Sequence, residues 1–205
     1  MFAQAVSTIA KRLLDFTIAS LGIIVLSPLM LIIAVAIRWR MGNPVLFRQR
    51  RAGYHGRPFT MIKFRTMTVS DSAGTQNSDA SRLTPLGALL RRYSLDEFPQ
   101  LWSVVKGEMS LVGPRPLFIE YLDFYTADQN RRHEVLPGMT GWAQVNGRNE
   151  LDWERKFALD VWYVEHQSFS LDLRILALTL WRVLTHRGIS RPGHATAERF
   201  DVQSQ

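Results

Sequence analysis

Residues 16–37 read FTIASLGIIVLSPLMLIIAVAI, an uncharged stretch of 22 residues rich in Ile, Leu, Val and Ala. As a straight helix this stretch would be about 33 Å long, close to the hydrocarbon thickness of a bilayer. It is too long for the apolar core of a signal peptide, and no small-residue cleavage motif follows it. The stretch therefore predicts a membrane helix near the N-terminus.

Two features of this helix favour a re-entrant path over a simple span. Ser27-Pro28 lies at its midpoint, where a proline removes a backbone hydrogen bond and favours a kink. Both flanks are basic, and positive charges favour the cytoplasmic side. A helix that enters, bends at Ser27-Pro28 and returns keeps both flanks inside, whereas hydropathy alone favours a transmembrane anchor. The flanking cations are Lys11, Arg12, Arg38, Arg40, Arg48, Arg50 and Arg51.

The whole chain of 205 residues is basic, with a net charge of +7. Its length suits one domain with a hydrophobic core, and its charge predicts an anionic partner: nucleic acid, acidic lipid or a phosphorylated substrate. The absence of cysteine excludes disulfides and thiolate-bound metals. The five histidines are scattered without a familiar zinc-binding spacing. Composition thus indicates an anionic partner without choosing its class.

The residues after the membrane helix predict an α/β fold that is mostly helical. We expect the membrane helix in residues 1–40, a cytosolic domain in residues 41–187, and a polar, loosely held tail in residues 188–205. Its amphipathic helices suit core packing, or docking at a membrane interface. The predicted strands are 45–47 and 59–64, and the predicted helices are 84–93, 95–106, 117–130, 153–166 and 171–185. Residues 68–81, 113–116 and 136–148 are expected to form a loop, a turn and irregular structure.

An adjacent acid pair, Asp96 and Glu97, lies in the segment SLDEFPQ at residues 94–100. Ser94 and Glu97 fit a helix capping box, which explains the segment without any chemistry. The functional interpretation makes Asp96 a nucleophile, because a carboxylate can attack phosphorus to form an acyl phosphate. Asp96 and Glu97 would then also bind a divalent cation such as Mg²⁺, which prefers carboxylate oxygen. The residues alone leave both interpretations open.

Several cations near the acid pair suit a ligand that carries phosphate. Arg115 lies between two prolines in the segment GPRP, and such a stiff turn limits the entropy lost when a guanidinium binds phosphate. Arg91 precedes the acid pair, and Lys63 and Arg65 lie further upstream. Taken singly, each is more often a solvated surface charge, yet together they predict a substrate-binding set. No P-loop and no G-x-G-x-x-G motif is present, so a kinase or Rossmann interpretation has no support.

These segments together resemble the small monotopic phosphoglycosyl transferases, bacterial sugar transferases that begin glycoconjugate assembly. The resemblance runs in order over nearly the whole chain, and several motifs in register are far more specific than any one of them. The C-terminal segment is similar to that of members acting on UDP-linked diacetamido sugars of the bacillosamine kind. Besides the apolar helix, the motifs are KRLLD (11–15), NPVLFRQ (43–49), KFRTM (63–67), LDEFPQL (95–101), KGEMSLVGPRP (106–116) and LPGMTGWAQVNGR (136–148).

The resemblance implies a reaction, a cofactor and a location. Asp96 would attack the β-phosphorus of a UDP-sugar, release UMP and pass the phospho-sugar to undecaprenyl phosphate, with Mg²⁺ as cofactor. Arg115, Lys63 and Arg91 match basic positions near the family's site. The family places a helix broken at a Ser-Pro pair in the bacterial inner membrane, with the catalytic domain on the cytoplasmic face.

Four further residues are candidates for nucleotide or sugar binding, although loop structure explains each equally well: Gln144, Asn146, Arg148 and Asp160. The expected partners are a UDP-sugar, undecaprenyl phosphate and anionic membrane lipid. A homo-oligomer is neither indicated nor excluded by the sequence.

Two other functions would use some of the same features. A membrane-tethered nucleic-acid binder would explain the charge and the anchor, but it leaves the acid pair and the Pro-Arg-Pro turn unused. No recognised nucleic-acid motif is present either. A structural anchor would recruit other proteins through its amphipathic helices and does not exclude catalysis. The sequence therefore favours an enzyme without a nucleic-acid partner.

Overall fold

The structure is a computed structural model that describes residues 2–68, 81–147, 151–185 and 200. Residues 69–80 of the predicted loop, all of the predicted tail except Phe200, and Arg148 lie outside the described residues. The described part is mostly helical, with two small two-stranded sheets. The predicted α/β class dominated by helices is therefore confirmed.

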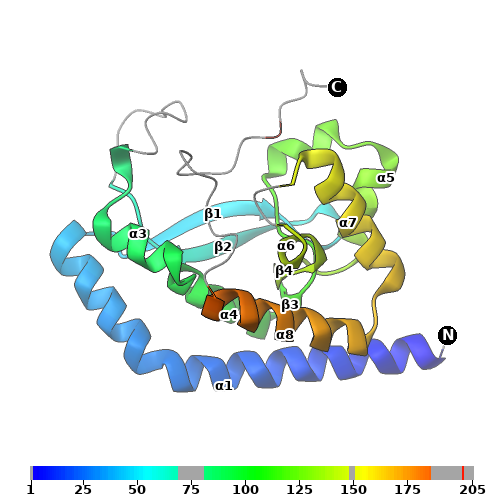
Figure 1. Ribbon diagram of the computed structural model, residues 1–205, viewed down its shortest axis with the longest axis horizontal. Helices are drawn as coiled ribbons and strands as arrows, with labels where there is room; N and C mark the ends of the chain where they lie inside the picture. Colours follow the sequence, from blue (N-terminus) through cyan, green and yellow to red (C-terminus); the bar gives the residue numbers. More distant parts are fainter. Residues whose placement is uncertain (1, 69–80, 148–150, 186–199, 201–205) are drawn as a thin grey trace.

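The N-terminal element α1 is one continuous helix, Phe2–Met41, with Pro28 inside it. It bends partway along its length in Figure 1, and the Ser27 hydroxyl donates a hydrogen bond of 2.8 Å to the carbonyl of Ile24. Its stretch Ile9–Met41 is long and apolar enough to cross a membrane, and only 11% of its most apolar window is buried. Side chains such as Val25, 72% exposed, therefore suit lipid rather than water. The re-entrant path stays a prediction.

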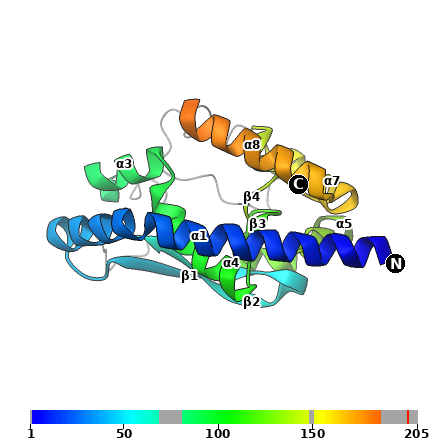
Figure 2. The ribbon, with the colours of Figure 1, turned by 90° about the horizontal axis from the view of Figure 1, so that it is seen from below.

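One side of α1 is docked on the rest of the protein. It packs against α4 (Leu101–Lys106), β3 (Ser110–Val112) and α8 (Phe169–Thr185). Figures 1 and 2 both show α4 alongside α1. Gly22 faces α4, and a Cβ atom there would lie 3.4 Å from the side chain of Leu101. Helix α1 and the rest of the chain thus share one packed core.

A β-hairpin follows α1 and carries the first candidate cation. Strands β1 (Leu46–Ala52) and β2 (Pro58–Phe64) pair in antiparallel register, with Phe47 opposite Lys63. The turn between them contains the short 3₁₀ helix η1 (Tyr54–Gly56). β2 agrees with the predicted strand, whereas β1 runs further than predicted because the basic residues after Phe47 stay extended and keep pairing. The hairpin therefore carries Lys63 toward the segment with the acid pair, which packs against β2.

The acid pair lies on a short 3₁₀ helix between two α-helices. Helix α3 (Pro85–Arg92) begins as predicted, with the Thr84 hydroxyl accepting a 2.9 Å hydrogen bond from the amide of Gly87. The predicted helix 95–106 is split into η2 (Leu95–Gln100) and α4. Pro99 lies inside η2 and has no amide to donate, so the α-helical pattern starts only after it.

The second sheet joins two segments that are distant in the sequence. Strand β3 and β4 (Gly138–Thr140) pair in parallel, with Ser110 opposite Gly138. Helices α7 (Trp153–His166) and α8 contribute to the same core, in which Tyr163 and Ile175 are fully buried. Both helices agree with the sequence prediction, α8 beginning two residues earlier. The core therefore fixes the end of β3, where the Pro-Arg-Pro turn begins.

Three sequence expectations were wrong in this part of the chain. Residues 117–130 do not form one helix: η3 (Ile119–Phe124) and α5 (Ala127–Asn130) are separated by an extended Tyr125 and a capping box at Thr126. Residues 136–148 are more regular than predicted, because they contain β4 and α6 (Trp142–Val145). In the tail, Phe200 is buried against Tyr121 and Phe157 rather than loosely held, because aromatic contacts outweigh the polar flanks.

Candidate active site

The structure brings Glu97 together with two of the predicted cations. Its Oε1 atom lies 2.6 Å from the Lys63 Nζ of β2 and 2.5 Å from the Arg115 Nη2 of the turn after β3. Asp96 lies next to it on η2, with 7% of its surface exposed. Four predicted site residues from three separate segments therefore meet at one place. We call Lys63, Asp96, Glu97 and Arg115 the acid–base cluster.

The capping-box interpretation of Ser94 and Glu97 is wrong. Ser94 adopts left-handed φ and ψ angles of 55° and 22°, and its side chain makes no capping hydrogen bond to η2. The Glu97 carboxylate bonds the two cations instead of the backbone of Ser94. A left-handed serine before a 3₁₀ helix is not the extended N-cap that a capping box requires. The acid pair therefore needs another explanation.

The two carboxylates of the cluster have opposite electrostatic environments. Burial alone would raise the pKa of Glu97, but the charges and hydrogen bonds of Arg115 and Lys63 outweigh it and hold the pKa far below its ordinary value. Burial and the neighbouring Glu97 charge raise the pKa of Asp96, against the weaker effects of Lys63, Arg91 and Arg115. Pairs of acids pushed apart in this way are typical of sites where each has its own role.

Arg91 reaches the cluster from helix α3. Its Nε donates a 3.0 Å hydrogen bond to the hydroxyl of Thr66, and its charge lowers the pKa of Asp96. The helix lies very close to the end of the hairpin because Gly87 has no side chain: a Cβ atom there would lie 1.9 Å from the carbonyl oxygen of Thr66. The structure therefore places Arg91 beside Asp96, as a third cation at the site.

The turn that carries Arg115 is held by backbone contacts. The amide of Gly113 donates to the carbonyl of Thr140, and the amide of Gly138 donates to the carbonyl of Pro114, each at 2.9 Å. A Cβ atom on Gly113 would lie 2.3 Å from the carbonyl oxygen of Leu136, so only glycine fits against β4. The guanidinium of Arg115 is thus mounted on a rigid backbone, as the two prolines indicate.

Arg65 and Asp160, two predicted substrate ligands, have structural partners instead. Arg65 is 5% exposed and donates hydrogen bonds to the carbonyls of Met41, Gly42 and Asn43, so it holds the end of α1. Asp160 forms a buried ion pair of 2.6 Å with Arg132. These contacts give both side chains a structural role, and residue type alone does not reveal such burial.

Sequence reasoning missed Arg132, which lies behind the turn. Its guanidinium donates to the Asp160 carboxylate and, at 2.8 Å, to the carbonyl of Arg115 itself. In the sequence this arginine belongs to the charged run RRHE and reads as a solvated surface residue. Only its contacts across the fold show that it supports the turn.

The remaining candidates from the glycine-rich segment differ in exposure. Both polar atoms of the Gln144 side-chain amide are buried, and neither has a hydrogen-bond partner within the described residues. Gly141, adjacent to Gln144, lies against the carbonyl of Gly113, so Gln144 is close to the Arg115 turn. Asn146 is exposed and donates to the carbonyl of Trp142. Arg148 lies outside the described residues. Gln144 is thus the better candidate for a ligand contact.

The cluster's donor set suits a divalent cation that shares its coordination with a phosphate. The described residues contain no group of three or more acidic, histidine or cysteine side chains that would hold a metal alone. Both recorded cation contacts of Glu97 use Oε1, which leaves Oε2 and the Asp96 carboxylate as oxygen donors. Mg²⁺ is commonly bound by one or two carboxylates together with substrate phosphates. Asp96 and Glu97 therefore fit the predicted cofactor.

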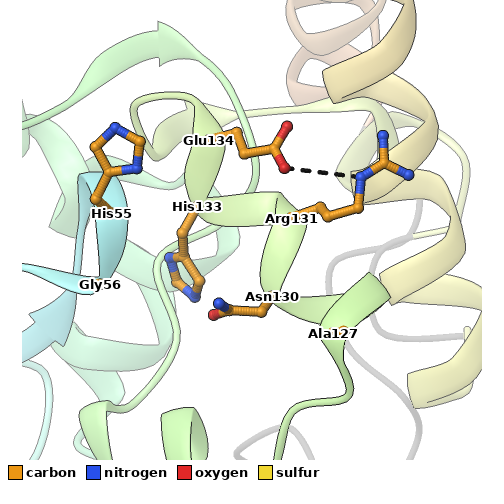
Figure 3. Close-up of a pocket in the computed structure, with 7 residues that line it drawn as sticks. All are labelled: His55, Gly56, Ala127, Asn130, Arg131, His133 and Glu134. Carbon is orange, nitrogen blue, oxygen red and sulfur yellow. Dashed lines mark ion pairs between the residues drawn. The ribbon is translucent and has the colours of Figure 1, made fainter.

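An open pocket elsewhere on the surface has different chemistry. Arg131 pairs with Glu134 at 3.7 Å, the contact that is dashed in Figure 3. No residue of the acid–base cluster lines this pocket, and the charge of Arg131 is also balanced by Glu165 at 2.8 Å. The lining of this pocket lacks an adjacent pair of carboxylates like Asp96 and Glu97. Its lining residues are His55, Gly56, Ala127, Asn130, Arg131, His133 and Glu134.

Comparison with known proteins places the chain in a family. The sequence model of the family described as bacterial sugar transferase matches residues 6–186, nearly the whole chain and all of the acid–base cluster. The chain belongs to the bacterial sugar transferase family. The resemblance inferred from the sequence motifs is therefore confirmed at the level of the family.

Three relatives show how the transferase compares with others. It is 54% identical to the "Uncharacterized sugar transferase EpsL" of Bacillus subtilis (strain 168), over 94% of its own length and 96% of that protein. It is 45% identical to the "UDP-glucose:undecaprenyl-phosphate glucose-1-phosphate transferase" of Xanthomonas campestris pv. campestris, over 86% of its own length but 39% of that protein. It is 35% identical to the "Exopolysaccharide production protein ExoY" of Rhizobium meliloti (strain 1021), over 90% of each chain.

Proposed function

We propose that this transferase moves a sugar 1-phosphate from a UDP-sugar to undecaprenyl phosphate through a covalent intermediate on Asp96. The acid–base cluster carries this proposal. Two cations bind one carboxylate, Glu97, and keep it ionised, while the adjacent Asp96 accepts no hydrogen bond from the described residues. A buried carboxylate with a raised pKa is a stronger nucleophile once ionised, because it is poorly solvated.

The first step forms one oxygen–phosphorus bond and breaks another. A carboxylate oxygen of Asp96 attacks the β-phosphorus of the donor, and the bond from that phosphorus to the bridging oxygen breaks. The electron pair leaves on the α-phosphate of UMP. In the second step a phosphate oxygen of undecaprenyl phosphate attacks the same phosphorus and returns the carboxylate of Asp96. The donor and the acceptor therefore react in turn at Asp96, which is the nucleophile in the first step and the leaving group in the second, so we expect ping-pong kinetics.

The cations around Asp96 match the charge of the donor. Lys63, Arg91 and Arg115 surround Asp96 with positive charge, and Lys63 and Arg115 contact Glu97. Ammonium and guanidinium groups bind phosphate oxygens, and Arg115, with 38% of its side chain exposed, can turn part of its guanidinium toward a ligand. Glu97 holds Lys63 and Arg115 in place, so they require little reorganisation when the charge on the phosphoryl group changes.

Asp96 and Glu97 are also the residues that would hold Mg²⁺. Bound there, Mg²⁺ would neutralise the negative charge of the diphosphate and stabilise the leaving UMP. The chain's own share is to present Oε2 of Glu97 and the Asp96 carboxylate on one short helix. We expect Glu97→Gln to weaken the dependence of the rate on Mg²⁺ rather than abolish transfer.

Two observations, the name of a relative and the likeness of the C-terminal segment, favour different donor sugars. The Xanthomonas relative is named for glucose-1-phosphate transfer from UDP-glucose, but this chain spans only 39% of that protein. The C-terminal segment is similar to that of members using UDP-linked diacetamido sugars. We propose a UDP-sugar as the donor class and place UDP-glucose and a UDP-diacetamido sugar first among those to be tested.

The exposed apolar surface of α1 supports a location at the bacterial inner membrane. Ile24 and Val25 are 68% and 72% exposed, and such a surface is covered by lipid at little cost. We propose that α1 re-enters the cytoplasmic leaflet through its bend, because both basic flanks then stay on the cytoplasmic side of the membrane. This keeps the acid–base cluster close to the plane where the acceptor phosphate lies.

UMP release from a panel of UDP-sugars tests the proposal. The purified protein is incubated with Mg²⁺ and undecaprenyl phosphate, and Asp96→Asn is measured beside it, with deamidation of the asparagine excluded by mass spectrometry. We expect UMP release that depends on Asp96, with the best donor naming the sugar. Wild-type rates in Asp96→Asn would refute the nucleophile. No UMP from any donor would favour the nucleic-acid or scaffold alternatives, which salt-sensitive nucleic-acid binding would separate.

A further inference from the structure

The carbonyl of Val112, the last residue of β3, is held by an unusual set of side chains. Its oxygen accepts hydrogen bonds from Lys11 Nζ at 3.0 Å and Ser110 Oγ at 2.9 Å, and the Tyr163 hydroxyl oxygen lies 3.2 Å away. Lys11 belongs to the membrane helix and Tyr163 to α7, so two distant elements converge on one peptide group. That group is the last one before Gly113 and the turn that carries Arg115.

A buried carboxylate, Asp172 of α8, ties the donors together. It is 2% exposed, and its two oxygens accept from Lys11 Nζ at 2.7 Å and Tyr163 Oη at 2.6 Å. The ammonium of Lys11 is therefore a member of a buried network rather than a cation at the lipid surface. The charge of Asp172 is balanced only by a residue of α1 among its recorded partners, so the network requires the membrane helix to be docked.

The later carbonyls of the turn that carries Arg115 are also held by hydrogen bonds. The carbonyl of Pro114 accepts from the amide of Gly138, and the carbonyl of Arg115 accepts from Arg132. Lys11 and Tyr163 thus hold the entry to a turn whose later carbonyls are held by β4 and by Arg132. The only charged group of the turn, the Arg115 guanidinium, projects to Glu97.

We infer that Lys11, Tyr163 and Asp172 are positioning residues that make the docked membrane helix set the place of Arg115 in the active site. The inference rests on the proposed function, in which Arg115 binds the donor diphosphate. Displacing the Val112 carbonyl shifts the Pro-Arg-Pro turn, and a small displacement of an oriented guanidinium lowers the rate strongly. None of the three contacts Asp96 or Glu97 within the described residues, so we expect their effect on the site to pass through the turn that carries Arg115.

A double-mutant cycle tests the inference. Tyr163→Phe removes one hydroxyl and keeps the ring, and we expect it to lower kcat/KM for the donor about tenfold. In an Arg115→Lys background, where the guanidinium is absent, the same change should lower kcat/KM by no more than about twofold. Equal losses in both backgrounds would overturn the inference, since a general loss of stability acts on both equally.

Arg12→Gln is the matched control for Lys11→Gln. Each removes one cation from the same basic flank of α1, but Arg12 donates to the carbonyls of Val104 and Val105 rather than to Val112. We expect the effect of Lys11→Gln to shrink in the Arg115→Lys background and that of Arg12→Gln to persist. Effects of both substitutions that stay unchanged would assign Lys11 to membrane docking alone.

Amide hydrogen exchange gives a readout that does not need turnover. In Tyr163→Phe, exchange in residues 112–118 should rise, while the β1–β2 hairpin should be unchanged. If wild-type protein releases no UMP, the proposed function fails, and this experiment still decides the positioning claim. Unchanged exchange in residues 112–118 would contradict it.

Discussion

Two buried clusters in this transferase are made of the same residue types but leave different groups available. In the Arg132–Asp160 pair, the two side chains are 2% and 5% exposed, and the guanidinium bonds a carboxylate and a backbone carbonyl. In the acid–base cluster, Arg115 is 38% exposed and a second carboxylate, Asp96, lies beside Glu97. Exposure of the guanidinium and the presence of a second carboxylate, rather than residue type, therefore separate a cluster that can meet a ligand from one that supports the fold.

The largest expected difference between the clusters is in catalysis. Asp96→Asn should lower kcat by at least about 10⁴-fold, because an amide cannot form the phospho-sugar intermediate. Asp160→Asn should keep measurable turnover, since Asp160 acts only through Arg132 and the Arg115 turn. Steady-state UMP release on both variants checks this, and a loss of equal size in the two would contradict the separation.

For the free energy of unfolding, the Arg132–Asp160 pair should matter more than the acid–base cluster. Asp160→Asn leaves the buried charge of Arg132 without its counter-ion and should cost about 3–5 kcal/mol in the free energy of unfolding. Glu97→Gln should cost less, because Arg115 is partly exposed and water can replace part of the lost contact. Denaturant titrations in one detergent compare the two variants. A Glu97→Gln protein as unstable as Asp160→Asn would mean that the acid–base cluster is structural.

The raised pKa of Asp96 predicts a pH effect on the rate. Burial and Glu97 raise this pKa above the ordinary value, and the nucleophile must be ionised, so kcat/KM should fall about tenfold per pH unit below it. Glu97→Gln removes a negative neighbour and should move the midpoint to lower pH. A pH–rate profile of both proteins measures the shift, and a midpoint that moves upward would reject the role given to Glu97.

The smallest effect is expected at Asn146. Its side chain is exposed and bonds only the carbonyl of Trp142 among the described residues, so Asn146→Ala should change kcat/KM by no more than about twofold. Gln144→Ala should have the larger effect, because the buried amide of Gln144 has no partner in the described part of the protein. Donor KM values for the two variants test this ranking, and the reverse order would contradict it.

The acid–base cluster could largely be predicted from the sequence, whereas its support could not. Asp96, Glu97, Arg115 and Lys63 lie in short motifs whose chemistry and resemblance both indicate a phosphate site. Arg132 is an ordinary member of a charged run, and its role depends on a contact with Arg115 that no local pattern encodes. Long-range contacts of this kind are fixed by packing, which a single sequence does not show.

The same reason explains other contacts that the sequence does not show. Arg65 resembles a phosphate ligand by type and by its neighbour Lys63, and its guanidinium donates to the carbonyls at the end of α1. The apolar pattern of residues 117–130 predicts one helix, but Thr126 begins a new helix with its own capping box. There a local contact outweighs the periodic pattern.

A rapid-quench measurement of UMP without acceptor tests the covalent intermediate most directly. Wild-type enzyme is mixed with its donor in the absence of undecaprenyl phosphate, and UMP is quantified against the amount of protein. The proposed mechanism predicts a burst of about one UMP per active site, with the phospho-sugar on the peptide that contains Asp96, and no burst from Asp96→Asn. UMP that forms only when undecaprenyl phosphate is present would contradict a covalent intermediate on Asp96.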